Sequence, residues 1–183
     1  MGSFLLAVAL AAVAIYVWNA LAWMVLPHHR PDFRPVASPK ALEDALLAAH
    51  LTPGLYMLPH QDQFEGGCKN PALAERCKTG PNAMIVSAAP GAMMKPTTFL
   101  FGFLLNLAQA LVLGLVLRWS APAFAGLGPT VGIAALLGLV TSGAPHLAQA
   151  IWMNFPWRHA LMGVLDSVVG YAAMGLVLHA MNG

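Results

Sequence analysis

The sequence predicts an all-α membrane protein, a bundle of four transmembrane helices with a small α+β extramembrane module between spans one and two. Of the 183 residues, 58% are hydrophobic and only 9% are charged, whereas soluble domains carry about 25% charged residues. Four apolar runs reach the length of about 20 residues that crossing a bilayer requires. The charged residues gather between the first two runs, because residues 27–97 hold seven of the nine Lys and Arg and six of the seven Asp and Glu.

The first span is predicted at residues 4–26, an apolar run interrupted only by Asn19. A cleaved signal peptide is the alternative, but its apolar stretch covers about 7–15 residues and follows a basic segment. The run here is longer, no basic residue precedes it, and Trp18 and Trp23 stand where a cleavage site needs small residues. We therefore expect a retained transmembrane helix.

Residues 27–97 are predicted to form the extramembrane module. Ser38 followed by a proline is typical of a helix start, and two short strands at residues 55–58 and 83–86 are expected to pair antiparallel. Between the strands lies a glycine-rich excursion, residues 60–81. One helix and one hairpin bury little core, so the module is expected to lean on the membrane helices or on a partner.

The remaining spans are predicted at residues 98–118, 129–152 and 157–181. Their connections are short, so consecutive helices are expected to be antiparallel neighbours. Trp119, Trp152 and Trp157 fall at the ends of these runs, where tryptophan side chains settle at the membrane–water interface.

The two cysteines, Cys68 and Cys77, both lie in the module, and we expect them to form a local disulfide in an oxidising compartment. The alternative is two unrelated free thiols, and a zinc site lacks further cysteine or histidine ligands nearby. Arg30, Arg34 and Lys95 flank the module and favour the cytoplasmic side, but loops longer than about 60 residues cross the membrane largely regardless of charge. The cysteine pair favours the periplasmic side.

Four polar residues are predicted to share one depth in the membrane. Asn19, Asn106, His146 and Asp166 each lie eight residues from the module-side end of their span, which corresponds to about 12 Å of helix rise. Polar groups in hydrocarbon normally face the bundle interior or a watery cavity. The sequence therefore predicts an intramembrane polar site with one contribution from every helix.

His146 and Asp166 are the strongest candidates for a functional role among the four polar residues at this depth. Asp166 is the only acidic residue in any span, and a pair with His146 would lower the cost of burying each group. Pro145 cannot donate a backbone hydrogen bond, so the third span should kink or open just before the histidine. The alternative is structural: small residues at four-residue spacing let helices approach closely, and Asn or His among them often only joins helices.

The histidines outside the spans suggest a weaker metal site. His28, His29 and His159 fall at the module-side interface and could meet there, with His60 as a further member. Several imidazoles can bind copper, zinc or iron, although interfacial histidines are more often merely solvated. The sequence identifies no cofactor. It contains none of the patterns typical of metalloproteases, Cys-x-x-Cys proteins, phosphate-binding loops or nucleophile elbows.

Three stretches resemble an uncharacterised family of small four-span bacterial integral membrane proteins with no assigned function. They are Trp23 to His29, Gly54 to Pro59, and Asn154-Phe155-Pro156 at the start of the last helix. The resemblance implies the four-span layout and a bacterial inner membrane, and it implies no reaction or site residue. The Gly66 to Gly80 excursion is extra relative to the family pattern.

These observations predict a non-enzymatic membrane protein that acts as a homo-oligomer or as an accessory part of a larger complex. The alternative is a redox, proton-handling or metal-binding protein that uses His146 and Asp166. A transporter is less favoured, because four spans without an internal repeat suit alternating access poorly. Nucleic acid is excluded as a partner, since the net charge is only +2 and no basic stripe follows the chain. The lipid bilayer is the one partner that composition requires.

Overall fold

The computed structural model describes residues 2–91, 94–120 and 126–182. These residues form two compact units, which are described separately: a helical unit that runs to Arg34 and resumes at Met94, and a module that begins at Pro35. The helical unit therefore includes residues 27–34, which the sequence analysis assigned to the module. Residues 27–34 thus belong to the same unit as the last helix, α7 (Trp157–Asn182), against which the candidate site forms.

Four helical segments in the described chain are long and apolar enough to cross a membrane, which confirms the predicted fold class. Their bounds are Gly2–Val25, Pro96–Ser120, Leu127–Met153 and Trp157–Met181. The first contains α1 (Gly2–Ala20), the second is α4 (Pro96–Ser120), the third contains α5 (Leu127–Gly138) and α6 (Ala144–Met153), and the fourth is α7 (Trp157–Asn182).

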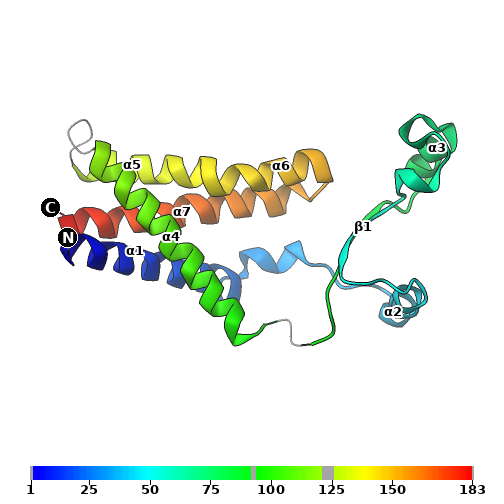
Figure 1. Ribbon diagram of the computed structural model, residues 1–183, viewed down its shortest axis with the longest axis horizontal. Coiled ribbons are helices and arrows are strands. Elements are labelled where there is room, and N and C mark those ends of the chain that lie inside the picture. The colour runs from blue at the N-terminus through cyan, green and yellow to red at the C-terminus, as the bar shows by residue number, and fades with distance from the viewer. Residues whose placement is uncertain (1, 92–93, 121–125, 183) are drawn as a thin grey trace. The chain divides into compact units, whose positions relative to one another are not determined.

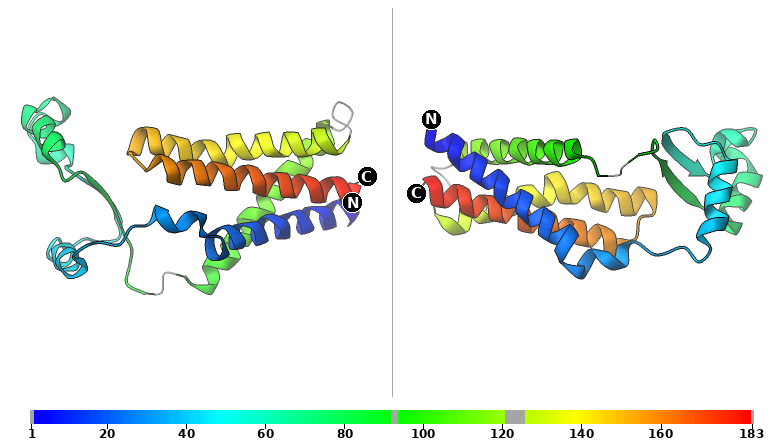
Figure 2. Two further views of the ribbon diagram at one scale, coloured as in Figure 1. Left: turned by 180° about the vertical axis from the view of Figure 1, so that it is seen from behind. Right: turned by 90° about the horizontal axis from the view of Figure 1, so that it is seen from below.

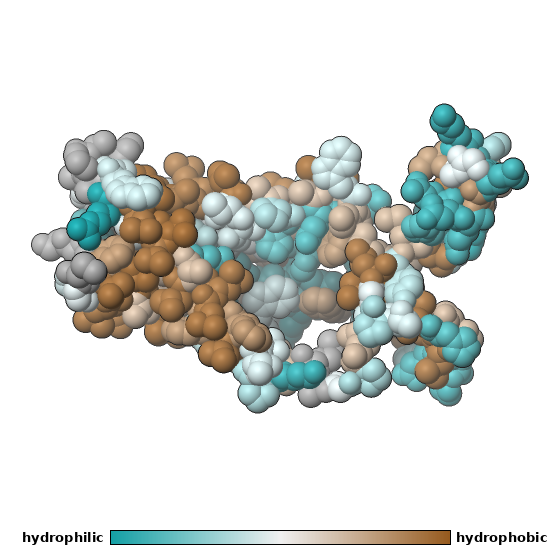
Figure 3. Space-filling model, in the orientation of Figure 1, coloured by the Kyte–Doolittle hydropathy of each residue, from teal (hydrophilic) through white to brown (hydrophobic). Residues whose placement is uncertain are grey.

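The last helix, α7, lies at the centre of the helical unit. It contacts α1 on one side and α5 and α6 on the other, while α4 packs chiefly against α1 (Figures 1 and 2). The core that these helices share is built from alanines and a few larger side chains, with Leu113, Met174 and Leu178 the largest that are fully buried. Outward-facing leucine, valine and phenylalanine side chains make the exposed surface over α1 and α4 mainly apolar (Figure 3).

Glycine and alanine let these helices approach closely. A Cβ atom on Gly138 would come within 2.6 Å of the Ser167 carbonyl oxygen, and one on Gly175 would come within 2.7 Å of the Ala134 Cβ. Gly114 of α4 lies against Phe4 and Val8 of α1. Because the bilayer supplies no hydrophobic force between helices, such close packing is the main attraction that holds them together.

Two π-helical turns interrupt the spans within the residues that the structure describes. One is Leu21–Val25 at the end of the first span, and the other is Leu139–Gly143, between α5 and α6. The second immediately precedes Ala144 and Pro145, where the missing N–H of proline was expected to open the helix. The first π-helical turn was not predicted, and it leads directly into a 3-10 helix, Pro27–Asp32.

In its described residues, the module contains two α-helices, two short 3-10 turns and a two-stranded antiparallel sheet, which confirms its α+β character. The helices are α2 (Pro39–Ala48) and α3 (Pro71–Thr79), and the strands are β1 (Gly54–Leu58) and β2 (Ala83–Ser87). The sheet pairs Gly54 with Ser87 and Leu58 with Ala83. Helix α3 was not predicted, although Asn70 provides an N-cap by accepting a hydrogen bond from the Ala72 amide at 2.8 Å.

The predicted disulfide is wrong: Cys68 and Cys77 are both free and exposed. Cys68 lies in a short 3-10 turn, where its thiol donates to the Gln61 side chain. Cys77 lies on helix α3, which begins only at Pro71, so the two thiols belong to separate helical elements. The periplasmic placement of the module relied on this bridge and stays a prediction.

Candidate functional site

The candidate site lies where the 3-10 helix Pro27–Asp32 packs against the first half of α7. Pro27 stands at the start of this helix, where its missing N–H costs nothing. The chain thus turns back onto α7 after the first span instead of leaving directly for the module. This return brings His28, His29 and Asp32 to Arg158, His159 and Asp166.

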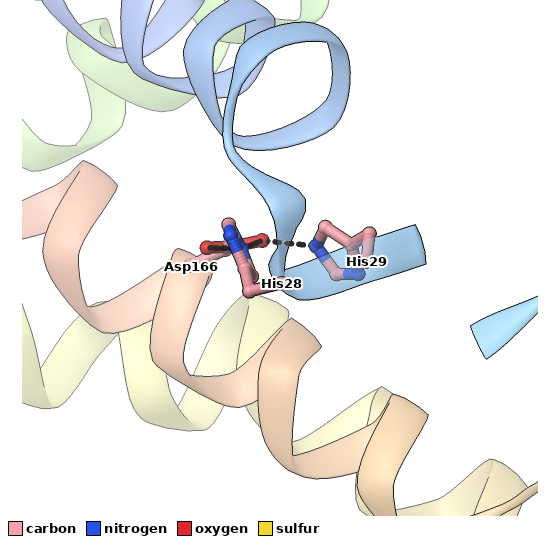
Figure 4. Close-up of side chains that lie close together, drawn as sticks. All are labelled: His28, His29 and Asp166. Carbon is pink, nitrogen blue, oxygen red and sulfur yellow. Dashed lines mark hydrogen bonds and ion pairs between the residues drawn. The ribbon is translucent and has the colours of Figure 1, made fainter. Parts of the chain in front are cut away.

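Asp166 is held by two consecutive histidines (Figure 4). The Nε2 atom of His29 lies 2.6 Å from Oδ2 of Asp166, and the Nε2 atom of His28 lies 3.1 Å from Oδ1. The indole N–H of Trp18 donates to the backbone carbonyl of Asp166 at 3.0 Å, which ties this turn of α7 to α1. The acidic residue that the sequence placed inside the membrane is therefore buried and paired.

His29 bridges two carboxylates. Its Nε2 faces Asp166, and its Nδ1 lies 2.8 Å from Oδ2 of Asp32, while only 4% of its side chain is exposed. Hydrogen bonds to two ionised carboxylates require an N–H on both ring nitrogens, so either the imidazole is charged or one carboxyl holds a proton. The indole of Trp23 stacks on this ring, with centroids 3.9 Å apart and planes 9° from parallel. Two hydrogen bonds and one stacked ring thus fix the orientation of His29.

Asp32 is the second carboxylate, and its side chain is only 1% exposed. In addition to His29, it accepts from His159 Nδ1 at 3.2 Å and from the guanidinium of Arg158. Arg158 also donates to the His28 carbonyl oxygen at 2.5 Å. The guanidinium therefore compensates the buried charge of Asp32 and ties the 3-10 helix to the start of α7.

The pKa of the Asp32 carboxyl lies below its ordinary value of 3.8. Burial alone raises this pKa, but hydrogen bonds from His29 and His159 and the positive charges of Arg158 and His29 outweigh it. A lowered folded-state pKa contributes stability that is fully present above the unfolded value, and this stability is lost as the pH falls through the folded value. The loss is therefore confined to pH values below about 3.8.

Asp32→Asn should consequently be less stable than the unaltered protein at neutral pH, by about 1.5–3 kcal/mol for hydrogen bonds to a charged group. The difference should shrink at pH values below 3.8, where the native carboxyl also becomes protonated. Thermal unfolding in detergent across this range measures both effects. Asp62→Asn, at a side chain 78% exposed in the module, is the control and should be silent. A penalty that is the same at every pH would contradict the assignment.

The structure assigns Asp166 partners other than the one the sequence suggested. Its carboxylate pairs with His28 and His29, and the Nδ1 atom of His146 is buried without a hydrogen-bond partner in the described chain. The ring of His146 lies against Gly163, where a Cβ atom would come within 2.6 Å of it. His146 and Asp166 do not pair although they lie at the same depth. Depth along a helix does not specify the direction in which a side chain points around the helix axis.

The two asparagines that were predicted at the same depth do not form hydrogen bonds with the site. Asn106 is buried at 5% exposure on α4 and Asn19 is half-buried on α1. Across residues 2–91, 94–120 and 126–182, neither side chain forms a hydrogen bond to His146 or Asp166.

The three interfacial histidines do come together. The ring centroids of His28 and His29 are 4.4 Å apart, and those of His29 and His159 are 6.4 Å apart. His60 belongs to the module, where its Nδ1 accepts a hydrogen bond from the Asp62 amide. Sequence reasoning missed Asp32 and Arg158 as members of the cluster. The spacing of His29 and Asp32, three residues apart in the stretch that follows Pro27, was the available signal.

Two overlapping sets of side chains in the described chain could hold a metal ion. One consists of His28, His29 and Asp166, and the other of His29, Asp32 and His159. Within each set, all ligand atoms lie within 4.8 Å of one another. Both sets offer two imidazoles and one carboxylate, a combination that zinc and iron(II) accept.

Residues 70–179 match a family described as "Protein of unknown function (DUF1761)", so the chain belongs to this family. The matched range includes His146, Arg158, His159 and Asp166, while the 3-10 helix with its two histidines precedes it. No curated protein and no solved structure is detectably similar to the chain.

Proposed function

We propose that this member of the DUF1761 family is an integral membrane protein that binds one divalent transition-metal ion. The ligands would be the Nε2 atoms of His28 and His29 and the carboxylate of Asp166. The observation that carries the proposal is the position of His29, whose Nε2 faces Asp166 while its Nδ1 is held by the buried Asp32.

The spacing of the donor atoms supports this ligand set. The two Nε2 atoms lie 2.6 Å and 3.1 Å from the oxygens of Asp166, and ligands around tetrahedral zinc, with bonds of about 2.0–2.2 Å, lie about 3.3 Å apart. A small outward movement of the side chains would therefore admit an ion. The metal would replace the protons that these hydrogen bonds now use, because imidazole must lose its proton on the coordinating nitrogen.

The surroundings of His29 favour this set over the one that contains Asp32. Metal-binding histidines almost always donate their second N–H to a carboxylate, a carbonyl oxygen or water, which fixes the tautomer and raises ligand basicity. Asp32 occupies this position at 2.8 Å and is itself held by Arg158 and His159. Its charge is thus already compensated by the guanidinium, whereas Asp166 has no cationic partner other than histidine in the described chain.

A role in an oligomer or a larger membrane complex is the second candidate. Helix α2 of the module buries none of its residues, and Leu47 within it is 72% exposed. Val86 of β2 is 78% exposed and lines the same groove as Leu47. Apolar side chains that remain this exposed in a small module are typical of a surface that meets a partner. This role and metal binding are compatible.

Metal titration of the purified protein tests the main proposal. Protein in detergent, stripped with a chelator, should bind one Zn²⁺ or Co²⁺ per chain. Replacing His29 with Ala or Asp166 with Asn removes a ligand, and we expect at least the 10–100-fold loss of affinity that is typical of the outer shell of a metal site. His179→Ala, in the last turn of α7, is the matched control and should bind normally. Absence of stoichiometric binding by the unaltered protein would overturn the proposal.

A further inference from the structure

We infer that the bound metal keeps an open coordination position, which takes a small monoanion from the side on which His28 lies. The inference deepens the proposed function and rests on it. Such a site can bind or activate a further ligand, whereas the metal of a structural site has all its positions filled by protein. The juxtaposition of His28, His29 and Asp166 carries it (Figure 4).

The number of available ligands is the first step. Structural zinc sites are closed by four protein ligands, whereas catalytic sites have three and leave a position for water or substrate. In the part of the chain that the structure describes, no fourth His, Cys, Asp or Glu joins the set of His28, His29 and Asp166. The nearest further acid, Asp32, is engaged by the outer nitrogen of His29 and by Arg158.

The exposure of the ligands gives the direction of access. The side chain of His28 is 21% exposed, compared with 9% for Asp166 and 4% for His29. The stacked indole of Trp23 covers one face of the His29 ring. The backbone of Asp166 is tied to α1 by the Trp18 indole. Approach is therefore closed beside His29 and open beside His28.

The charge of the loaded site selects the kind of ligand. A divalent ion with Asp166 and two neutral imidazoles carries a net charge of +1, and the charges of Asp32 and Arg158 offset each other. An uncompensated charge is costly where water is scarce. One monoanion, such as hydroxide or azide, would neutralise the site. A neutral ligand would leave the charge in place, and a dianion would reverse it.

Azide added to the Co²⁺-loaded protein tests the inference, because the visible absorption of Co²⁺ depends on its coordination number and ligands. We expect saturable changes in the absorption bands, with competition by other small anions. The His179→Ala variant should respond like the unaltered protein. A double variant, His29→Ala with Asp166→Asn, supplies the background from azide and weakly bound Co²⁺ and should show no saturable change.

The two proposals fail in different ways in this experiment. If the protein binds Co²⁺ stoichiometrically but azide leaves its spectrum unchanged, the site is closed, and the open position is overturned while metal binding stands. If the unaltered protein binds no stoichiometric Co²⁺, the proposed function itself is overturned. A response to azide that survives in the double variant would show that the anion binds elsewhere, and it would also overturn the open position.

Discussion

Replacing Asp166 with Asn should destabilise the metal-free protein by about 3–5 kcal/mol, the typical cost of breaking a buried charged pair. The carboxylate accepts from both His28 and His29, and Asp166 is only 7% exposed, so solvent cannot replace the lost contacts. The amide of asparagine has only one oxygen to accept with, and it adds donors that face the imidazole nitrogens. We expect the loss to appear in thermal or denaturant unfolding in detergent with a chelator present.

A double-mutant cycle distinguishes a pair of Asp166 with His29 from a pair of Asp166 with His146. Asp166→Asn combined with His29→Ala should lose much less stability than the sum of the two single losses, because either change alone breaks the same contact. Asp166→Asn combined with His146→Ala should show much weaker coupling, since no hydrogen bond joins these residues. Strong coupling to His146 with additivity at His29 would restore the pair that equal membrane depth suggested.

Gly138→Ala should destabilise the helical unit by about 1–3 kcal/mol, the usual cost of overpacking a tight core. The added methyl carbon would lie 2.6 Å from the Ser167 carbonyl oxygen and 2.7 Å from the Tyr171 Cβ atom. The nearest obstacle is backbone, so α5 and α7 must move apart to relieve the clash. The separation should weaken the packing on both sides of the contact.

Gly132→Ala is the matched control, because it makes the same substitution in the same helix. A Cβ atom at this position would meet nothing within 4 Å, and alanine is favoured over glycine in a helix by about 0.5–1 kcal/mol. The control should therefore be neutral or stabilising when thermal unfolding is measured. Equal behaviour of the two variants would show that α5 and α7 are not in close contact at Gly138.

The spans were predictable because hydropathy is a local property. A helix that crosses the bilayer satisfies its own backbone hydrogen bonds, so a long apolar run specifies the element without reference to the rest of the chain. The opening of the third span followed in the same way from Pro145, whose missing N–H acts within its own helix. The hairpin of the module had strand-forming residues on both sides of a glycine-rich stretch. Helix α3 within that stretch was missed because its nine residues are polar on average.

The sequence by itself determined that this chain has four spans, that its charges gather between the first two, and that Asp166 must find a partner inside the membrane. Only the tertiary structure decided which partner. The depth of a residue along its helix follows from its residue number. Which neighbour its side chain faces is decided only when the helices pack against one another. The π-helical turn Leu21–Val25 and the 3-10 helix Pro27–Asp32 return the chain to α7. This return buries His29 between two carboxylates that lie 134 residues apart in the sequence, because a buried charge is tolerated only where an opposite charge and hydrogen bonds compensate it.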